Sequence, residues 1–126
     1  MQKVTGIGGI FFKAADPKAL LDWYRDMLGL EITEFGGAIF DWREAAGMPP
    51  GRTIWSIFPS DTTNFEPGKA GFMINYRVAD VRAMIAELRK KGAKVDDRIE
   101  ESEFGTFGWV LDPEGNRIEL WQPPAE

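Results

Sequence analysis

Apolar and polar positions follow the same order twice along the chain. Each half opens with an apolar run, passes through Ala-Asp into a stretch with helical spacing of apolar residues, reaches a glycine and returns to short apolar runs. Asp16 and Asp80 occupy corresponding places 64 residues apart, and Gly29 and Gly92 follow them at nearly equal distances. Because self-similarity at a fixed spacing indicates a repeated unit, the pattern predicts two modules with the same plan.

Each stretch of helical spacing carries the end signals of a helix. Asp16 is a favourable N-cap with Pro17 at the first helical position, and Gly29 follows the last apolar residue. Asp80 caps the second stretch, which ends in two lysines before Gly92. The apolar stripes of the two predicted helices are Leu20, Trp23, Tyr24, Met27 and Leu28 in the first, and Val81, Met84, Ile85 and Leu88 in the second.

Short apolar runs bounded by turn residues predict the strands. After the first helix they cover residues 30–35, 38–42 and 53–58, and after the second residues 94–99, 105–111 and 117–122. Together with the run before each helix, they give each module the order βαβββ. Residues 43–52 and 59–69 are rich in proline, glycine and polar residues, which is typical of a loop and of a connection between modules. We therefore predict an α+β fold in a single domain, 1–126, with modules at about 1–62 and 66–126.

Composition excludes several classes of function. The 126 residues are 44% hydrophobic and 28% charged, as in an ordinary globular domain, and the formal charge of −5 leaves no basic stripe for nucleic acid or an anionic membrane. Cysteine and histidine are absent, which removes disulfides, thiolate nucleophiles and the commonest metal ligand and general base. The opening MQKVTGIGGIFF lacks the features of a signal peptide, so we expect a cytoplasmic protein without a membrane partner.

Aromatic residues and one carboxylate carry the candidate chemistry. The chain has five Trp, nine Phe and two Tyr, and aromatic side chains either fill cores or line apolar pockets. In the last apolar run, Glu119 stands between Ile118 and Leu120, and alternation in a strand places it on one face with Arg117 and Trp121. Glu119 therefore either faces water or lines a cavity, and the alternation alone leaves both open.

A family resemblance appears in the opening GIGGIFFKAADPKALLDWYRDMLGL and the closing FGWVLDPEGNRIELWQP. With the duplicated order of elements, these segments resemble the vicinal oxygen chelate superfamily, which includes glyoxalase I, bleomycin resistance proteins and extradiol dioxygenases. The resemblance covers nearly the whole chain. It implies two tandem βαβββ modules whose sheets curl into a shared cleft, and it implies a homodimer, because many members pair their modules.

The resemblance also implies where metal ligands would stand. In metal-dependent members the ligands come from the first and last strands of each module, and these positions correspond to Gly9, Met73, Glu119 and Trp55, with Ser56 as the alternative to Trp55. Of these residues, only Glu119 suits a hard or borderline metal, and one carboxylate cannot make a three-ligand site. We therefore expect a divergent member that lacks the histidine ligands and binds no metal and no cofactor.

The same correspondence assigns the faces of the strands. If Gly9 and Met73 point into the cleft, residues two positions away do so too, including Ile7, whereas Ile10 and Tyr76 point toward the helices. The predicted ligand-binding residues are Phe11, Lys13, Trp55, Met73, Asn75, Arg77 and Trp121, with Glu119 as the candidate catalytic residue. These residues also have structural interpretations: the tryptophans as core or dimer-interface residues, Met73 as a core gap-filler, Lys13 and Arg77 as solvated residues near strand ends, and Arg77 as an ion-pair partner of Glu119 or another acid.

Two functions from different classes remain open. The first is a metal-free small-molecule-binding protein of the glyoxalase/bleomycin-resistance type, whose partner is a small apolar or aromatic molecule. The alternative is a metal-free isomerase or lyase, in which Glu119 is the general base and Arg77 or Lys13 stabilises the developing anion. A metal-dependent glyoxalase or dioxygenase would need additional carboxylates from loops, such as Asp41, Glu44 or Glu103. A purely structural or partner-binding domain is also compatible with the sequence.

Overall fold

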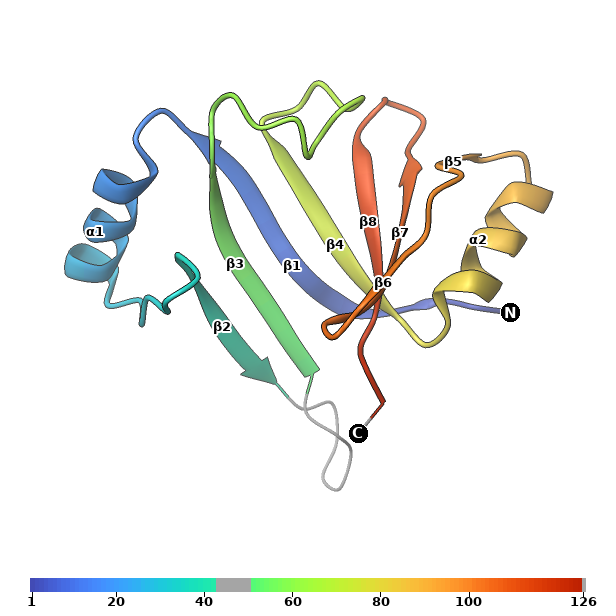
Figure 1. Ribbon diagram of the computed structural model, residues 1–126, viewed down its shortest axis with the longest axis horizontal. Helices are drawn as coiled ribbons and strands as arrows, with labels where there is room; N and C mark the ends of the chain where they lie inside the picture. The colour runs from blue at the N-terminus through green and yellow to red at the C-terminus, as the bar shows by residue number, and fades with distance from the viewer. Residues whose placement is uncertain (43–50, 126) are drawn as a thin grey trace.

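The computed structural model of the chain describes residues 1–42 and 51–125 as one curved sheet with two helices on its outer side (Figure 1). In chain order the elements are β1 (Val4–Ala14), α1 (Pro17–Leu28), β2 (Gly37–Trp42), β3 (Gly51–Pro59), β4 (Phe72–Val78), α2 (Val81–Lys90), β5 (Lys94–Val95), β6 (Glu100–Ser102), β7 (Gly105–Leu111) and β8 (Arg117–Gln122). This architecture confirms the predicted α+β fold.

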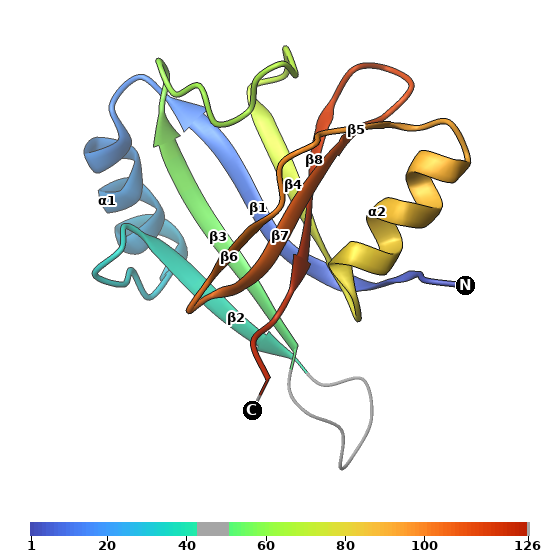
Figure 2. The ribbon, with the colours of Figure 1, turned by 45° about the vertical axis from the view of Figure 1, so that its right-hand side comes forward.

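The two modules join edge to edge through their first strands. The strand order is β2-β3-β1-β4-β8-β7-β5, and β6 also pairs with β7. β1 and β4 pair antiparallel, while each pairs parallel with the last strand of its own module, β1 with β3 and β4 with β8. As a result, the helices lie at opposite ends of the sheet (Figure 2).

The register between β1 and β4 reproduces the repeat in the sequence. Ile10 lies directly opposite Ile74, and these residues are 64 positions apart, as are the two helix-capping aspartates. The residue pairs on either side of it exchange places when each residue is replaced by its counterpart 64 positions away. A local twofold relation therefore passes between β1 and β4 at this pair, and the sequence repeat is a structural one.

Both helices begin where the sequence predicts. The Asp16 carboxylate accepts a hydrogen bond from the Ala19 N–H at 3.1 Å, and the Asp80 carboxylate accepts one from the Ala83 N–H at 3.0 Å. Gly29 has the left-handed conformation (φ 73°) that ends α1. In the described ranges, neither helix is long and apolar enough to cross a membrane.

Apolar clusters lie on both faces of the sheet. We call the face toward the helices the outer face and the opposite one the inner face. On the outer face, Val81 and Ile85 of α2 pack with three sheet residues, Val78, Val110 and Leu120. On the inner face, a second group, which we call the inner cluster, consists of Phe65, Met73 and Trp109 with Phe11, Phe58 and Phe107 packed against them. The inner face is therefore strongly aromatic.

Two predicted strands differ from the structure. Residues 30–35 form no strand, because the Thr33 N–H donates to the carbonyl of Gly37 at 2.7 Å and closes a turn into β2. The predicted strand 94–99 is reduced to β5, and β6 follows it along the chain. Of the predicted loop 43–52, residues 43–50 lie outside the described residues and the last two begin β3.

Candidate functional site

The register of β4, β8 and β7 places three inner-face side chains in a row. Glu119 on β8 has Asn75 of β4 as its partner on one side and Trp109 of β7 on the other. Residues directly opposite in neighbouring strands carry their side chains on the same face. Asn75, Glu119 and Trp109 thus form a continuous row, which we call the Glu119 row. The sequence analysis did not single out Trp109, although the DPEGN turn that joins its strand to the strand of Glu119 can be recognised in the sequence.

Both oxygens of Glu119 accept a hydrogen bond within this row. Asn75 Nδ2 donates to Oε1 at 2.6 Å and Trp109 Nε1 donates to Oε2 at 3.0 Å. Burial raises the pKa of Glu119, while the two hydrogen bonds and the positive charge of Arg117 oppose the rise. Glu119 is a half-buried residue, so part of it remains exposed to solvent. The carboxylate is therefore held in one position and is a weaker acid than an ordinary Glu.

Asn75 itself has an acceptor without a partner. Its side chain is only 3% exposed, and its Oδ1 accepts no hydrogen bond from any described residue. A Cβ atom on Gly8 would lie 2.2 Å from this oxygen and 2.9 Å from the Trp121 ring. A β-bulge in β1 between Ile7 and Gly9 presents Gly8 to these groups. The absence of a side chain at Gly8 therefore gives Asn75 and Trp121 their space.

Phe11 and Trp121 also lie on this face, as predicted from the sequence. The Phe11 ring folds back over Gly9, where a Cβ atom would lie 2.7 Å from it, and packs 5.6 Å from the Phe58 ring. Trp121 Nε1 donates to the carbonyl of Phe104 at 2.8 Å, which ties β8 to the turn between β6 and β7. Aromatic surface thus borders the Glu119 row.

The two basic residues of the prediction lie near the ends of the inner face. The Lys13 ammonium is 5.6 Å from the centroid of the Phe65 ring. Arg77 lies two residues after Asn75 on β4, and its guanidinium is 5.8 Å from the centroid of the Trp42 ring. Within the described part of the chain, no ion pair links Arg77 to Glu119. The interpretation of Arg77 as the ion-pair partner of Glu119 is therefore wrong for the described residues.

Met73 lies inside the inner cluster rather than at its surface. It is 3% exposed and packs with Phe65 and Trp109. This placement matches the structural interpretation of a core gap-filler. The Phe11 ring packs against the cluster that contains Met73.

The predicted inward orientation of Trp55 is wrong. Trp55 lies on the outer face, 5.5 Å from the Phe12 ring and 4.8 Å from the Tyr24 ring of α1, measured between ring centroids. The parallel register pairs Phe11 with Ser56, just as Asn75 pairs with Glu119 in the other module. Ser56, the alternative in the sequence analysis, is therefore the counterpart of Glu119.

The predicted inward orientation of Ile7 is also wrong. Alternation from Gly9 predicts that Ile7 points inward, but its partner is Tyr76, which packs with the outer cluster beneath α2. The bulge at Gly8 adds one residue to β1 and reverses the alternation beyond it. Alternation of side chains along the sequence therefore does not predict the faces correctly beyond a β-bulge.

The residues at the four implied metal positions do not fit a metal. They are Gly9, Met73, Ser56 and Glu119, which together offer one carboxylate, one hydroxyl and one thioether, and the Phe11 ring covers Gly9. Across residues 1–42 and 51–125, no group of three or more acidic side chains is placed to hold a metal ion. Asp41 is paired with Arg52 at 3.2 Å and Glu103 is exposed, while Glu44 lies outside the described residues.

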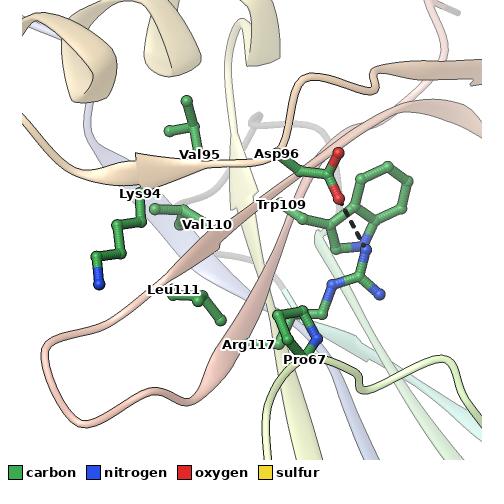
Figure 3. Close-up of a pocket in the computed structure, with 8 residues that line it drawn as sticks. All are labelled: Pro67, Lys94, Val95, Asp96, Trp109, Val110, Leu111 and Arg117. Carbon is green, nitrogen blue, oxygen red and sulfur yellow. Dashed lines mark ion pairs between the residues drawn. The ribbon is translucent and has the colours of Figure 1, made fainter.

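A pocket of about 160 Å³ lies at the edge of the sheet beside the Glu119 row (Figure 3). Trp109 belongs to both, because its side chain lines the pocket and its Nε1 donates to Glu119. Arg117 packs on Trp109, with its guanidinium 4.8 Å from the ring centroid. The same guanidinium lies 3.6 Å from the Asp96 carboxylate and donates a hydrogen bond to the carbonyl of Asn64. Burial lowers the pKa of Arg117, and the charge of Asp96 opposes this. The remaining lining residues are Pro67, Lys94, Val95, Val110 and Leu111.

Comparisons with solved structures show the fold. The chain is similar to a Streptomyces coelicolor methylmalonyl-CoA epimerase in complex with 2-nitronate-propionyl-CoA, with a TM-score of 0.70, 22% identity and coverage of 98% of this chain and 100% of that one. It is also similar to a glyoxalase/bleomycin resistance protein/dioxygenase superfamily member from Vibrio splendidus, with a TM-score of 0.60, 12% identity and coverage of 97% and 99%. At these identities the likeness is one of fold alone.

A third similar structure is named for a different activity. It is an NAD-dependent benzaldehyde dehydrogenase from Legionella pneumophila, with a TM-score of 0.61, 16% identity and coverage of 92% of this chain and 98% of that one. No curated protein matches the chain. The family model described as the glyoxalase-like domain matches residues 9–121, from Gly9 in β1 to Trp121 in β8. The chain therefore belongs to the glyoxalase-like domain family of the vicinal oxygen chelate superfamily, as its sequence predicts.

Proposed function

We propose that the protein binds a small apolar or aromatic molecule on the inner face, around Glu119. The observation that carries this proposal is a carboxylate fixed by two hydrogen bonds inside an aromatic surface. Small-molecule sites combine apolar walls with a few converging polar groups that orient the ligand. Glu119 and Arg77 supply groups of opposite charge on one face, and neither needs a metal to act.

Matched tryptophan variants test this site. Indole and phenol, titrated by ligand-observed NMR, are expected to bind saturably, with dissociation constants on the order of millimolar for molecules of this size. Trp121→Phe should weaken binding several-fold, because its ring borders the Glu119 row. Trp55→Phe is the control, since Trp55 packs beneath α1 on the outer face. Equal effects of the two variants, or no saturable binding, would contradict the proposal.

A second candidate function is proton transfer at a carbon acid, with Glu119 as the base. The observation that favours it is the raised pKa of Glu119, which burial brings closer to the range useful for a base near neutral pH. One structural neighbour is a methylmalonyl-CoA epimerase in complex with methylmalonyl-CoA, which makes this thioester a reasonable test substrate. No second acid or base adjoins Glu119 in the row, so binding remains the better-supported function.

Hydrogen–deuterium exchange separates the two candidates. A binding protein leaves the C2 proton of methylmalonyl-CoA unexchanged in D₂O, as followed by NMR over hours. Exchange that is lost in Glu119→Gln while binding persists would establish the base instead.

We also propose that the protein forms a homodimer through the outer face between the two helices. Four apolar side chains from the two central strands, Val4, Ile7, Ile10 and Phe72, are each between 38% and 47% exposed there. Apolar patches of this kind on a protein surface usually mark an interaction site. Sedimentation is expected to show a dimer for the native chain and a monomer for Ile10→Glu, with Ile39→Glu on β2 as the control. A native monomer at tens of micromolar would rule this out.

A further inference from the structure

Glu119 is a partly desolvated carboxylate that lacks a cation. Its two hydrogen bonds come from neutral groups, the Asn75 amide and the Trp109 indole. Among the described residues no ion pair involves Glu119, and Arg117, whose charge does reach it, is instead paired with Asp96. Charges removed from water are ordinarily paired. The site therefore contains a negative charge whose natural complement is absent from the described chain.

Around Glu119, the positions that can still form hydrogen bonds are acceptor positions. An ionised carboxylate has about four acceptor positions, and the Glu119 row fills one on each oxygen. Asn75 Oδ1 is buried, and no residue in the described ranges donates to it. Both groups lie side by side on adjacent strands, since Asn75 and Glu119 are direct partners. A molecule that binds here gains most if it brings hydrogen-bond donors.

We propose that the ligand carries a cationic donor group, an ammonium or amidinium, on an aromatic or apolar body, and that this group binds at the Glu119 carboxylate, beside Asn75. This inference rests on the proposed binding function and adds the chemical class of the ligand. The rings of Phe11 and Trp121 border the site and add cation–π attraction. The net charge of −5 favours the approach of cations.

Arg77 gives the ligand an orientation. It lies two residues along β4 from Asn75, which is about 7 Å at the rise of an extended strand. A cationic group is repelled at the Arg77 end and attracted at the Glu119 end. The uncharged or anionic part of the ligand therefore lies toward Arg77.

Three probes of the same size test the inference: benzamidine, benzamide and benzoate. They share one ring and differ in carrying a cationic donor, a neutral amide or an anion. We expect benzamidine to bind about tenfold more tightly than benzamide, since charge-assisted hydrogen bonds are roughly twice as strong as neutral ones, and benzoate to bind most weakly. Titration calorimetry of the full chain, without a polyhistidine tag, gives the three dissociation constants.

Two isosteric variants localise the effect. Glu119→Gln should reduce the preference for benzamidine over benzamide to about twofold or less, because it removes the charge and keeps the shape. Glu31→Gln removes an equal charge from an exposed position far along the sequence and should preserve the preference. Thermal unfolding of both variants verifies that they are folded. A preference that survives Glu119→Gln would overturn the inference.

The pH dependence gives an independent readout. Benzamidine affinity should fall as pH decreases through the raised pKa of Glu119, whereas benzamide affinity should stay constant. The charged groups near Glu119 are Arg117 on β8 and Glu100 on β6, and its other neighbours, Asn75 and Trp109, are neutral. A flat profile for benzamidine would contradict the assignment to Glu119.

The outcomes separate this inference from the binding function itself. If all three probes bind equally and Trp121→Phe weakens them all, the aromatic site exists but does not select cations, and only the inference fails. If none of the probes binds at 10 mM or so, well above the millimolar range expected for fragments, both fail. Selective benzamidine binding that depends on Glu119 supports both.

Discussion

Replacement of Phe65 by alanine is expected to lower the free energy of unfolding by about 3–5 kcal/mol, the usual cost of removing a fully buried phenylalanine. Phe65 is 1% exposed, its ring centroid lies 5.3 Å from that of Phe58, and it packs with Met73 and Trp109. Total stabilities of small domains are about 5–15 kcal/mol. This one substitution should therefore remove a large share of the stability.

Urea unfolding followed by circular dichroism measures the effect. Phe104→Ala is the matched control, because Phe104 is 67% exposed and the same atoms are removed from a surface position. We expect the midpoint for Phe104→Ala to stay close to that of the native chain. Similar losses in the two variants would mean that the connection between the modules is not part of the core.

Replacement of Gly105 by alanine is expected to cost about 3 kcal/mol or more, the combined effect of backbone strain and overpacking. Gly105 has φ 122°, a conformation that L side chains rarely adopt, and a Cβ atom there would lie 2.2 Å from the backbone oxygen of Gln122. That oxygen belongs to β8, so relief of the contact must separate β7 from β8. The Trp121 indole nitrogen, 2.9 Å from the same point, would also move.

Gly115→Ala distinguishes the two causes of this cost. Gly115 has φ 83°, but nothing lies within 4 Å of a Cβ atom there. Its replacement should therefore cost only about 1 kcal/mol, the strain of a left-handed alanine. Chemical denaturation of both variants gives the comparison. An equal cost at the two glycines would show that the contact with Gln122 relaxes freely.

Local signals explain which parts of the fold were predictable. The caps at Asp16 and Asp80 and the glycine at position 29 act within a few residues, and the structure has them where the sequence predicts. The repeat in the sequence also predicted the two-module plan. Residues 30–35 were predicted wrongly because an apolar run becomes a strand only if a neighbour pairs with it, and here a turn at Thr33 intervenes.

The site was predictable only as far as alternation holds. Glu119, Asn75 and Trp121 were assigned to one face correctly because β4 and β8 run without a bulge between them. Trp55 was assigned to the wrong face because the register of β3 against β1 is set by long-range pairing, and an error of one residue reverses every side chain. Trp109 joins Glu119 through the β7–β8 pairing across the DPEGN turn, and the sequence analysis did not use that turn to align the two strands.

The twofold relation between β1 and β4 places different residues at equivalent positions of the two modules. Phe11 and Ser56 occupy in the first module the places that Asn75 and Glu119 occupy in the second. The two half-sites are equivalent by position, but the first carries an aromatic ring and a hydroxyl, and the second carries an amide and a carboxylate. The inner face is thus a symmetric frame with two different ends, and a molecule bound there as proposed would meet different surroundings at each end.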